Sequence, residues 1–153
     1  MAADAAAFSD VTLATLSTQT LERLNAVLPS NWSLGNPVDI IGDAPVARYE
    51  AALRVLQEAP EAGALLFIHA PTAIVPSAEI AQALAPLARP SPPKPPRVMG
   101  CWLGDQAVAQ ARQTFLAADI AQFDMPEQAI RAFSMLVRYR ANQAELLEAP
   151  RVP

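Results

Sequence analysis

The stretch 64-ALLFIHAPTAIVPSAEIA-81 decides the fold class of this 153-residue chain. Residues 64–68 form a continuous apolar run, which is typical of a strand that is covered on both faces. Ser77 is predicted to cap a helix that runs to Leu87, because Ser favours this position and apolar residues recur at helical spacing after it. A buried strand that leads through a short turn into a helix predicts a parallel α/β sheet.

The same alternation continues on both sides of this stretch. Further strands are predicted at 36–41, 98–103 and 120–123, and further helices at 46–58, 106–118 and from 126 onward. Residues 9–28 are predicted to be partly helical, and the alanine-rich residues before them contain no strand. A flavodoxin-like sheet normally has five strands, whereas four are visible here. We therefore expect an α/β fold, a flavodoxin-like doubly wound parallel sheet in three layers that is one strand short.

The composition indicates a single folded domain at residues 1–150 and argues against several functions. Hydrophobic residues make up 52% of the chain and charged residues 17%, a balance that favours a buried core over disorder. The net charge is −4 and no basic cluster occurs, so nucleic acid is not an expected partner. No signal peptide and no apolar run of membrane-spanning length is found, so no membrane association is expected. Cys101 is the only cysteine, which fits a cytoplasmic protein without disulfides.

The stretch 89-RPSPPKPPR-97 contains five prolines. Proline lacks the N–H that a helix or a strand ladder uses, so neither element is expected there. A stiff surface loop is therefore predicted at 89–97.

Ligands of such sheets bind at the carboxyl ends of the strands. At the end of the strand at 64–68, the turn contains Pro71, Thr72 and Ala73 and leads into a helix. The unpaired N–H groups and the dipole of a helix N-terminus form a general cradle for a phosphate group. Any strand-to-helix turn has these features, so the same residues also fit a plain connection.

His69, the only histidine, has two interpretations. A single histidine at a strand end is most often a hydrogen-bonded structural residue, while its ordinary pKa near neutrality leaves a catalytic role open. The sequence contains no metal-ligand cluster, no dinucleotide-binding glycine pattern, no P-loop and no nucleophile elbow. The residues alone therefore assign no catalytic residue and no metal site.

Four segments in order resemble the NDP-forming acyl-CoA synthetase family: 35-GNPVDIIGDAPVARYEAALRVL-56, 64-ALLFIHAPTA-73, 99-MGCWLGDQAVAQAR-112 and 125-MPEQAIRAFSMLVRYRANQ-143. Each motif alone is weak, but their order across nearly the whole chain is specific. This is the superfamily of succinyl-CoA synthetase and ADP-forming acetate–CoA ligase, and the chain looks closest to bacterial ligases fused to a GNAT acetyltransferase domain. The matching part is the second flavodoxin-like, ligase-CoA domain.

The resemblance implies a mechanism for the complete enzyme, which uses CoA, phosphate and ATP or ADP. A histidine on a neighbouring domain carries the phosphoryl group between an acyl phosphate and a nucleotide, which an ATP-grasp domain holds. The present module supplies one of two helix N-termini that face the phosphohistidine, so its part in catalysis is electrostatic. Its expected partners are the CoA-binding and phosphohistidine domains and the ATP-grasp domain.

Residue by residue, the resemblance assigns phosphate binding to Pro71, Thr72 and Ala73. Other turns of the binding face match the family at Asn36, Pro37, Asp39, Gly42, Trp102 and Gly104. His69 departs from the family pattern, because relatives are expected to have Asn or another small polar residue there. It therefore does not inherit the role of phosphoryl carrier.

The family's first strand and glycine-rich turn have no counterpart in this sequence. This predicts an N-terminally truncated domain with a cleft between the strand at Val38 and the strand at Leu65. Residues 148–153 resemble the linker toward the ATP-grasp domain, and the module is expected to be inactive alone. Two other interpretations stay open, a non-catalytic regulatory module that binds phosphate or CoA and a degenerate gene fragment.

Overall fold

The computed structural model describes residues 2–9, 11–90 and 98–147. In this part of the chain three parallel strands form one sheet in the order β1 (Leu65–His69), β2 (Val98–Trp102), β3 (Gln122–Phe123). Leu65 pairs with Val98 and His69 with Trp102, so β1 and β2 end level with each other. The predicted parallel α/β sheet is thus confirmed, with strand bounds that differ by one or two residues.

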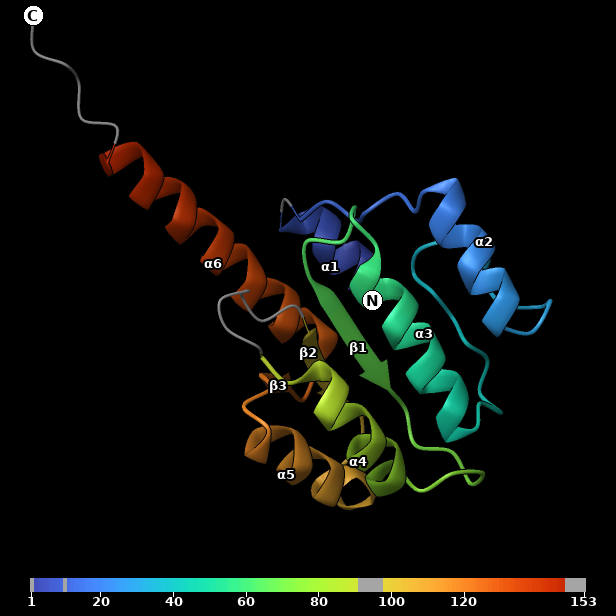
Figure 1. The fold of residues 1–153 in the computed structure, drawn as a ribbon. Coiled ribbons are helices and arrows are strands. Elements are labelled where there is room, and N and C mark those ends of the chain that lie inside the picture. Colours follow the sequence, from blue (N-terminus) through green and yellow to red (C-terminus); the bar gives the residue numbers. More distant parts are fainter. Residues whose placement is uncertain (1, 10, 91–97, 148–153) are drawn as a thin grey trace, which may run out of the picture.

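Helices lie on both faces of this sheet, which confirms the three-layer, flavodoxin-like arrangement (Figure 1). On one face α3 (Val46–Glu58), α4 (Ser77–Ala88) and α5 (Ala109–Ala117) pack side by side. On the other, α6 (Pro126–Leu147) contacts β2, β3 and α1 (Ala2–Phe8). The remaining helix, α2 (Thr18–Val27), packs against α3, and a 3-10 turn at Gln106–Val108 precedes α5.

Most predicted helices begin and end where the sequence pattern places them. The helix over Val46–Glu58 has the predicted bounds, and the last helix begins at Pro126, which lacks an N–H that the first turn would leave unpaired. The predicted cap at Ser77 is wrong, because Pro76 occupies the cap position and Ser77 is the first helical residue. Of the predicted Pro-rich loop, 91–97 lie outside the described residues, as does the tail at 148–153.

The strand predicted at 36–41 is wrong. Residues 38–41 belong to no strand of the described chain, and side chains bind their backbone instead. The Asp39 N–H donates to Ser33 Oγ at 2.9 Å, and the Ile41 N–H donates to Asp39 Oδ1 at 2.8 Å. An extended segment becomes a strand only beside another backbone, and β1 pairs with β2 alone in the described part of the sheet. The predicted cleft between this segment and β1 stays a prediction.

The core is built around aromatic rings on the sheet. Trp102 and Phe115 are fully buried, and their ring centroids lie 5.0 Å apart in an edge-to-face contact. Gly100 makes room for this pair, because a Cβ added there would lie 2.7 Å from a ring carbon of Phe115. Trp102, predicted as part of a binding-face turn, is therefore a core residue at the end of β2.

A second, smaller core cluster lies between α2 and α3, around Leu24, Trp32 and Val55. Glu61 fastens the start of α2 to the end of α3, because its carboxylate accepts the Ser17 N–H at 2.8 Å. This hydrogen bond is the main cause that lowers the pKa of Glu61 to about 2.

Candidate functional site

Two of the predicted turns meet at the carboxyl ends of β1 and β2. The Leu103 N–H donates to the His69 carbonyl at 2.8 Å, which fastens the loop after β1 to the turn after β2. Gly104 has φ +109°, and a Cβ added to it would lie 3.6 Å from Pro71 Cγ. Pro71 and Gly104, both predicted to lie on the binding face, are therefore neighbours.

Arg112 of α5, which was not predicted as a site residue, holds this region together. Its Nη2 donates to the carbonyl oxygens of Trp102 and Gly104, both at 2.8 Å, and forms an ion pair with Asp124 at 3.1 Å. One guanidinium thus joins the turns that follow β2 and β3. The sequence signal was an arginine on the apolar stripe of the predicted helix, three residues before Phe115.

The predicted phosphate-binding residues lie on the surface of the loop at 70–76. Pro71, Thr72 and Ala73 are all exposed, and Thr72 Oγ1 accepts the Ile74 N–H at 3.4 Å. Residues 74–76 separate them from α4, which begins at Ser77, within one residue of the predicted start. Pro76 lacks an N–H and fits the cap position better than the interior of a helix.

The N-terminus of α4 has no side-chain cap. The N–H groups of Glu79 and Ile80 bond to the Pro76 carbonyl at 3.0 and 3.4 Å. Within the described residues, the Ser77 and Ala78 N–H groups have no hydrogen-bond partner. These are the donors that the dipole of a helix directs toward an anion.

The turn at 36–42 contributes less than the resemblance implies. Asn36 Nδ2 donates to the Ala14 carbonyl at 2.9 Å, and one Asp39 oxygen accepts the Ile41 N–H, so both groups serve the local backbone. Gly42 is exposed and precedes α3 in the chain, and the start of α3 lies at the same end of β1 as the loop at 70–76 (Figure 1). Asn36, Asp39 and Gly42 make no hydrogen bond with that loop in the described chain.

His69 is 2% exposed and lies beneath the loop. Its Nε2 is 3.1 Å from Ser77 Oγ and its Nδ1 is 3.4 Å from the Tyr49 hydroxyl. The ring stacks parallel to Phe67 and lies edge-to-face against Trp102 at 5.1 Å. Hydroxyls can donate or accept, so the neutral ring is satisfied on both nitrogens in either tautomer. The geometry is that of a structural histidine, with no open space beside it for a substrate.

Burial of His69 predicts that acid weakens the fold. Burial lowers the pKa of the imidazole from its ordinary 6.5, so near that pH the unfolded chain binds the proton more readily. The stability that the fold gains from neutral, buried His69 is fully present above about pH 6.5, and it is lost as the pH falls toward the lowered pKa of this residue. We expect the urea midpoint of the wild type to fall between pH 7.5 and 5.5. In His69→Gln the share of this decrease that His69 causes should be absent. If the urea midpoint decreased equally between these two pH values in both proteins, the prediction would be contradicted.

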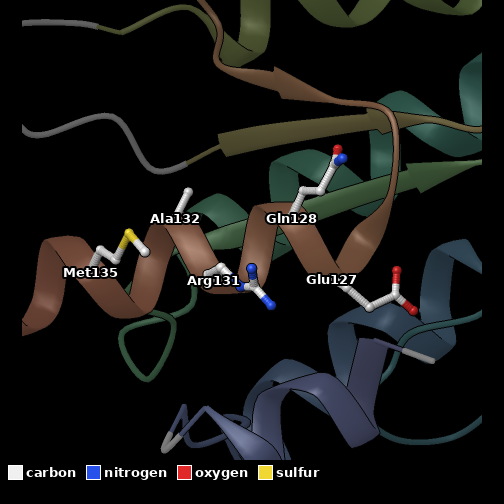
Figure 2. Close-up of a pocket in the computed structure, with 5 residues that line it drawn as sticks. All are labelled: Glu127, Gln128, Arg131, Ala132 and Met135. Carbon is white, nitrogen blue, oxygen red and sulfur yellow. The ribbon is translucent and has the colours of Figure 1, made fainter.

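Two hollows lie along α6 and contain none of the predicted site residues. The first, of about 290 Å³, is lined by Glu127, Gln128, Arg131, Ala132 and Met135 (Figure 2). The second, of about 390 Å³, lies between the middle of α6 and residues Ser9, Val11 and Thr12. In the described ranges, no three His, Cys, Asp or Glu side chains gather where they could hold a metal ion. The helices among those residues include none long and apolar enough to cross a bilayer.

The fold and the turns at its strand ends define a parallel α/β module in which hydrogen bonds to backbone carbonyls hold these turns together. A family model described as the Ligase-CoA domain matches residues 1–147, and the chain belongs to this family. The resemblance seen in the sequence is thereby confirmed.

The chain is similar to larger proteins. It is 31% identical over 139 residues to acetate–CoA ligase [ADP-forming] I of Archaeoglobus fulgidus, covering 91% of this chain and 19% of that protein. Among solved structures, it resembles the apo form of dinucleotide-forming acetyl-coenzyme A synthetase 1 of Ca. Korarchaeum cryptofilum, with a TM-score of 0.86 at 23% identity. That match covers 99% of this chain and 33% of the other. The same enzyme in complex with phosphate and ADP gives a TM-score of 0.83 at 22% identity, with 99% and 32% coverage. The chain thus spans a fifth to a third of the length of these relatives.

Proposed function

We propose that the chain is a module of an ADP-forming acyl-CoA synthetase of the acetate–CoA ligase type. The observation that carries this proposal is the family match over residues 1–147, together with the 31% identity to an acetate–CoA ligase. The module works in the cytoplasm with CoA-binding and phosphohistidine domains and with an ATP-grasp domain, on the same chain or on others. The complete enzyme uses CoA, phosphate and ATP or ADP, whereas the module has no activity alone.

The part of the module in the reaction is to bind the phosphoryl group of a phosphohistidine that another domain carries. The exposed loop at 70–76 and the uncapped start of α4 support this role. Pro71, Thr72 and Ala73 form the rim, and the free N–H groups of Ser77 and Ala78 are the donors. These dipoles are in place before the reaction, so they stabilise negative charge without reorganising. Neither proton transfer nor a covalent step is assigned to this chain.

A phosphate titration tests the cradle. Amide resonances of Thr72, Ala73, Ser77 and Ala78 should shift on addition of inorganic phosphate, both in the chain alone and more strongly in the complex with its partner domains. Glu79→Gln should tighten phosphate binding about two- to fivefold, because it removes a negative charge from the first turn of α4. Glu58→Gln, at the far end of α3, serves as the matched control. Unshifted amides in the complex would refute the cradle.

Reconstitution tests the module itself. Mixing the chain with the CoA-binding, phosphohistidine and ATP-grasp domains of a related enzyme should restore acyl-CoA-dependent ATP formation, which none of the parts shows alone. Activity of the isolated chain would overturn the proposal. A chain that unfolds without a cooperative thermal transition would favour a degenerate fragment instead.

A further inference from the structure

The loop at 70–76 has little structure of its own. It contains one hydrogen bond between its residues, from the Ile74 N–H to Thr72 Oγ1 at 3.4 Å. Val75 is half-buried against the neighbouring core, and all other side chains of the loop are exposed. Its shape therefore depends on how its two ends, His69 and Ser77, are held.

One side-chain contact joins these two ends. His69 Nε2 lies 3.1 Å from Ser77 Oγ, and both side chains are buried. His69 is the last residue of β1 and Ser77 the first of α4, so this hydrogen bond closes the base of the loop. The rings of Phe67 and Trp102 keep the imidazole in this orientation, and the Tyr49 hydroxyl lies 3.4 Å from its other nitrogen.

The same contact also bears on the helix N-terminus. A serine at the N-cap position accepts an N–H of the first turn, but Pro76 occupies that position here and Ser77 is the first helical residue. The Ser77 hydroxyl lies against the imidazole, so the first residue of α4 is joined to the last residue of β1. The Ser77 and Ala78 N–H groups have no partner among the described residues and stay available to a ligand.

From these contacts we infer that His69 is the positioning residue of the loop at 70–76 and of the N-terminus of α4. It acts through Ser77 and touches no phosphoryl group. The positioning would serve to hold the phosphate donors in place, and only this part of the inference rests on the proposed function. The hydrogen bond itself can be tested without phosphate.

Amide hydrogen exchange in phosphate-free buffer tests the inference on the whole chain. The Glu79 and Ile80 amides report on the loop, because both bond to the carbonyl of its last residue, Pro76. In His69→Phe, which keeps a ring in the aromatic stack, and in Ser77→Ala, these amides should exchange about fivefold faster, as loss of one hydrogen bond implies. His69→Gln, whose amide still bonds, should exchange more slowly than His69→Phe.

Two controls separate this local effect from a loss of stability. Tyr49→Phe removes the hydroxyl on the other side of the imidazole and should leave the Glu79 and Ile80 amides within twofold of the wild type. Amides in the middle of α5 should exchange unchanged in every variant, since global unfolding would accelerate them too. Unchanged exchange at Glu79 and Ile80 in both His69→Phe and Ser77→Ala would overturn the inference.

A phosphate titration of the same variants separates the inference from the proposed function. Weaker phosphate shifts in His69→Phe and Ser77→Ala than in the wild type support both. If the wild type shows no phosphate shift while exchange at Glu79 and Ile80 rises in the variants, the cradle is refuted and His69 still positions the loop. If phosphate binds equally to wild type and variants, the positioning role is refuted.

Discussion

Replacing Phe115 by Ala is expected to lower the free energy of unfolding by about 3–5 kcal/mol, which is the usual cost of removing a buried aromatic ring. Phe115 is fully buried, and its ring contacts both Trp102 and Phe67 on the sheet. Gly100 lies directly against this ring, because a Cβ added to it would be 2.7 Å from a ring carbon of Phe115. Urea unfolding followed by circular dichroism measures the change.

The neighbouring residue provides a matched control. Leu116 is on the same helix with 56% of its surface exposed, so Leu116→Ala should change the free energy of unfolding by no more than about 0.5 kcal/mol. The two variants lie at adjacent positions of one helix and have the same product residue, and they differ in the side chain removed and in its burial. A loss of less than about 1 kcal/mol in Phe115→Ala would mean that α5 does not pack on the sheet as described.

Regular apolar patterns allowed most of the fold to be predicted from the sequence. Strands over 64–68 and 98–103 could be predicted because buried parallel strands are continuous apolar runs, and helix α3 because its apolar stripe is regular. The segment at 36–41 has a similar apolar pattern but forms no strand. A pattern indicates what a segment favours, whereas a strand also needs a partner backbone, which residue types do not reveal.

The candidate site was also predicted only in part from the sequence. Pro71 and Gly104 could be placed at one edge of the sheet because parallel strands end together. The start of α4 was predicted to within one residue, whereas the contact between Ser77 and His69 could not be predicted, since it joins two side chains across the base of the loop. Arg112 was missed for a related reason, because its partners are backbone carbonyls, and carbonyls leave no trace in a sequence.

Replacing Arg112 by Ala is expected to lower the free energy of unfolding by about 2–3 kcal/mol. The guanidinium bonds two carbonyl oxygens and is itself only 20% exposed, so its removal leaves both oxygens, of which that of Trp102 is partly buried, without this donor. Hydrogen bonds to charged groups contribute about 1.5–3 kcal/mol. The exposed Arg131 of α6 provides the matched control, and Arg131→Ala should change little.

Two further variants decide which contact of Arg112 matters. Asp124 is 64% exposed, so its ion pair is screened by water, and Asp124→Asn should cost at most about 1 kcal/mol. Arg112→Lys keeps the charge, but its nitrogen lies one bond closer to the main chain than the Nη2 that donates to both carbonyls, so it should lose most of the stability that Arg112→Ala loses. If Arg112→Lys instead matched the wild type and Asp124→Asn matched Arg112→Ala, the ion pair would be the main interaction.

Unfolding in 1 M salt adds an independent measurement, because salt weakens the ion pair and leaves the carbonyl bonds nearly unchanged. An Arg112 contribution that persists in salt would mean that the turns after β2 and β3 are held by hydrogen bonds to their backbone.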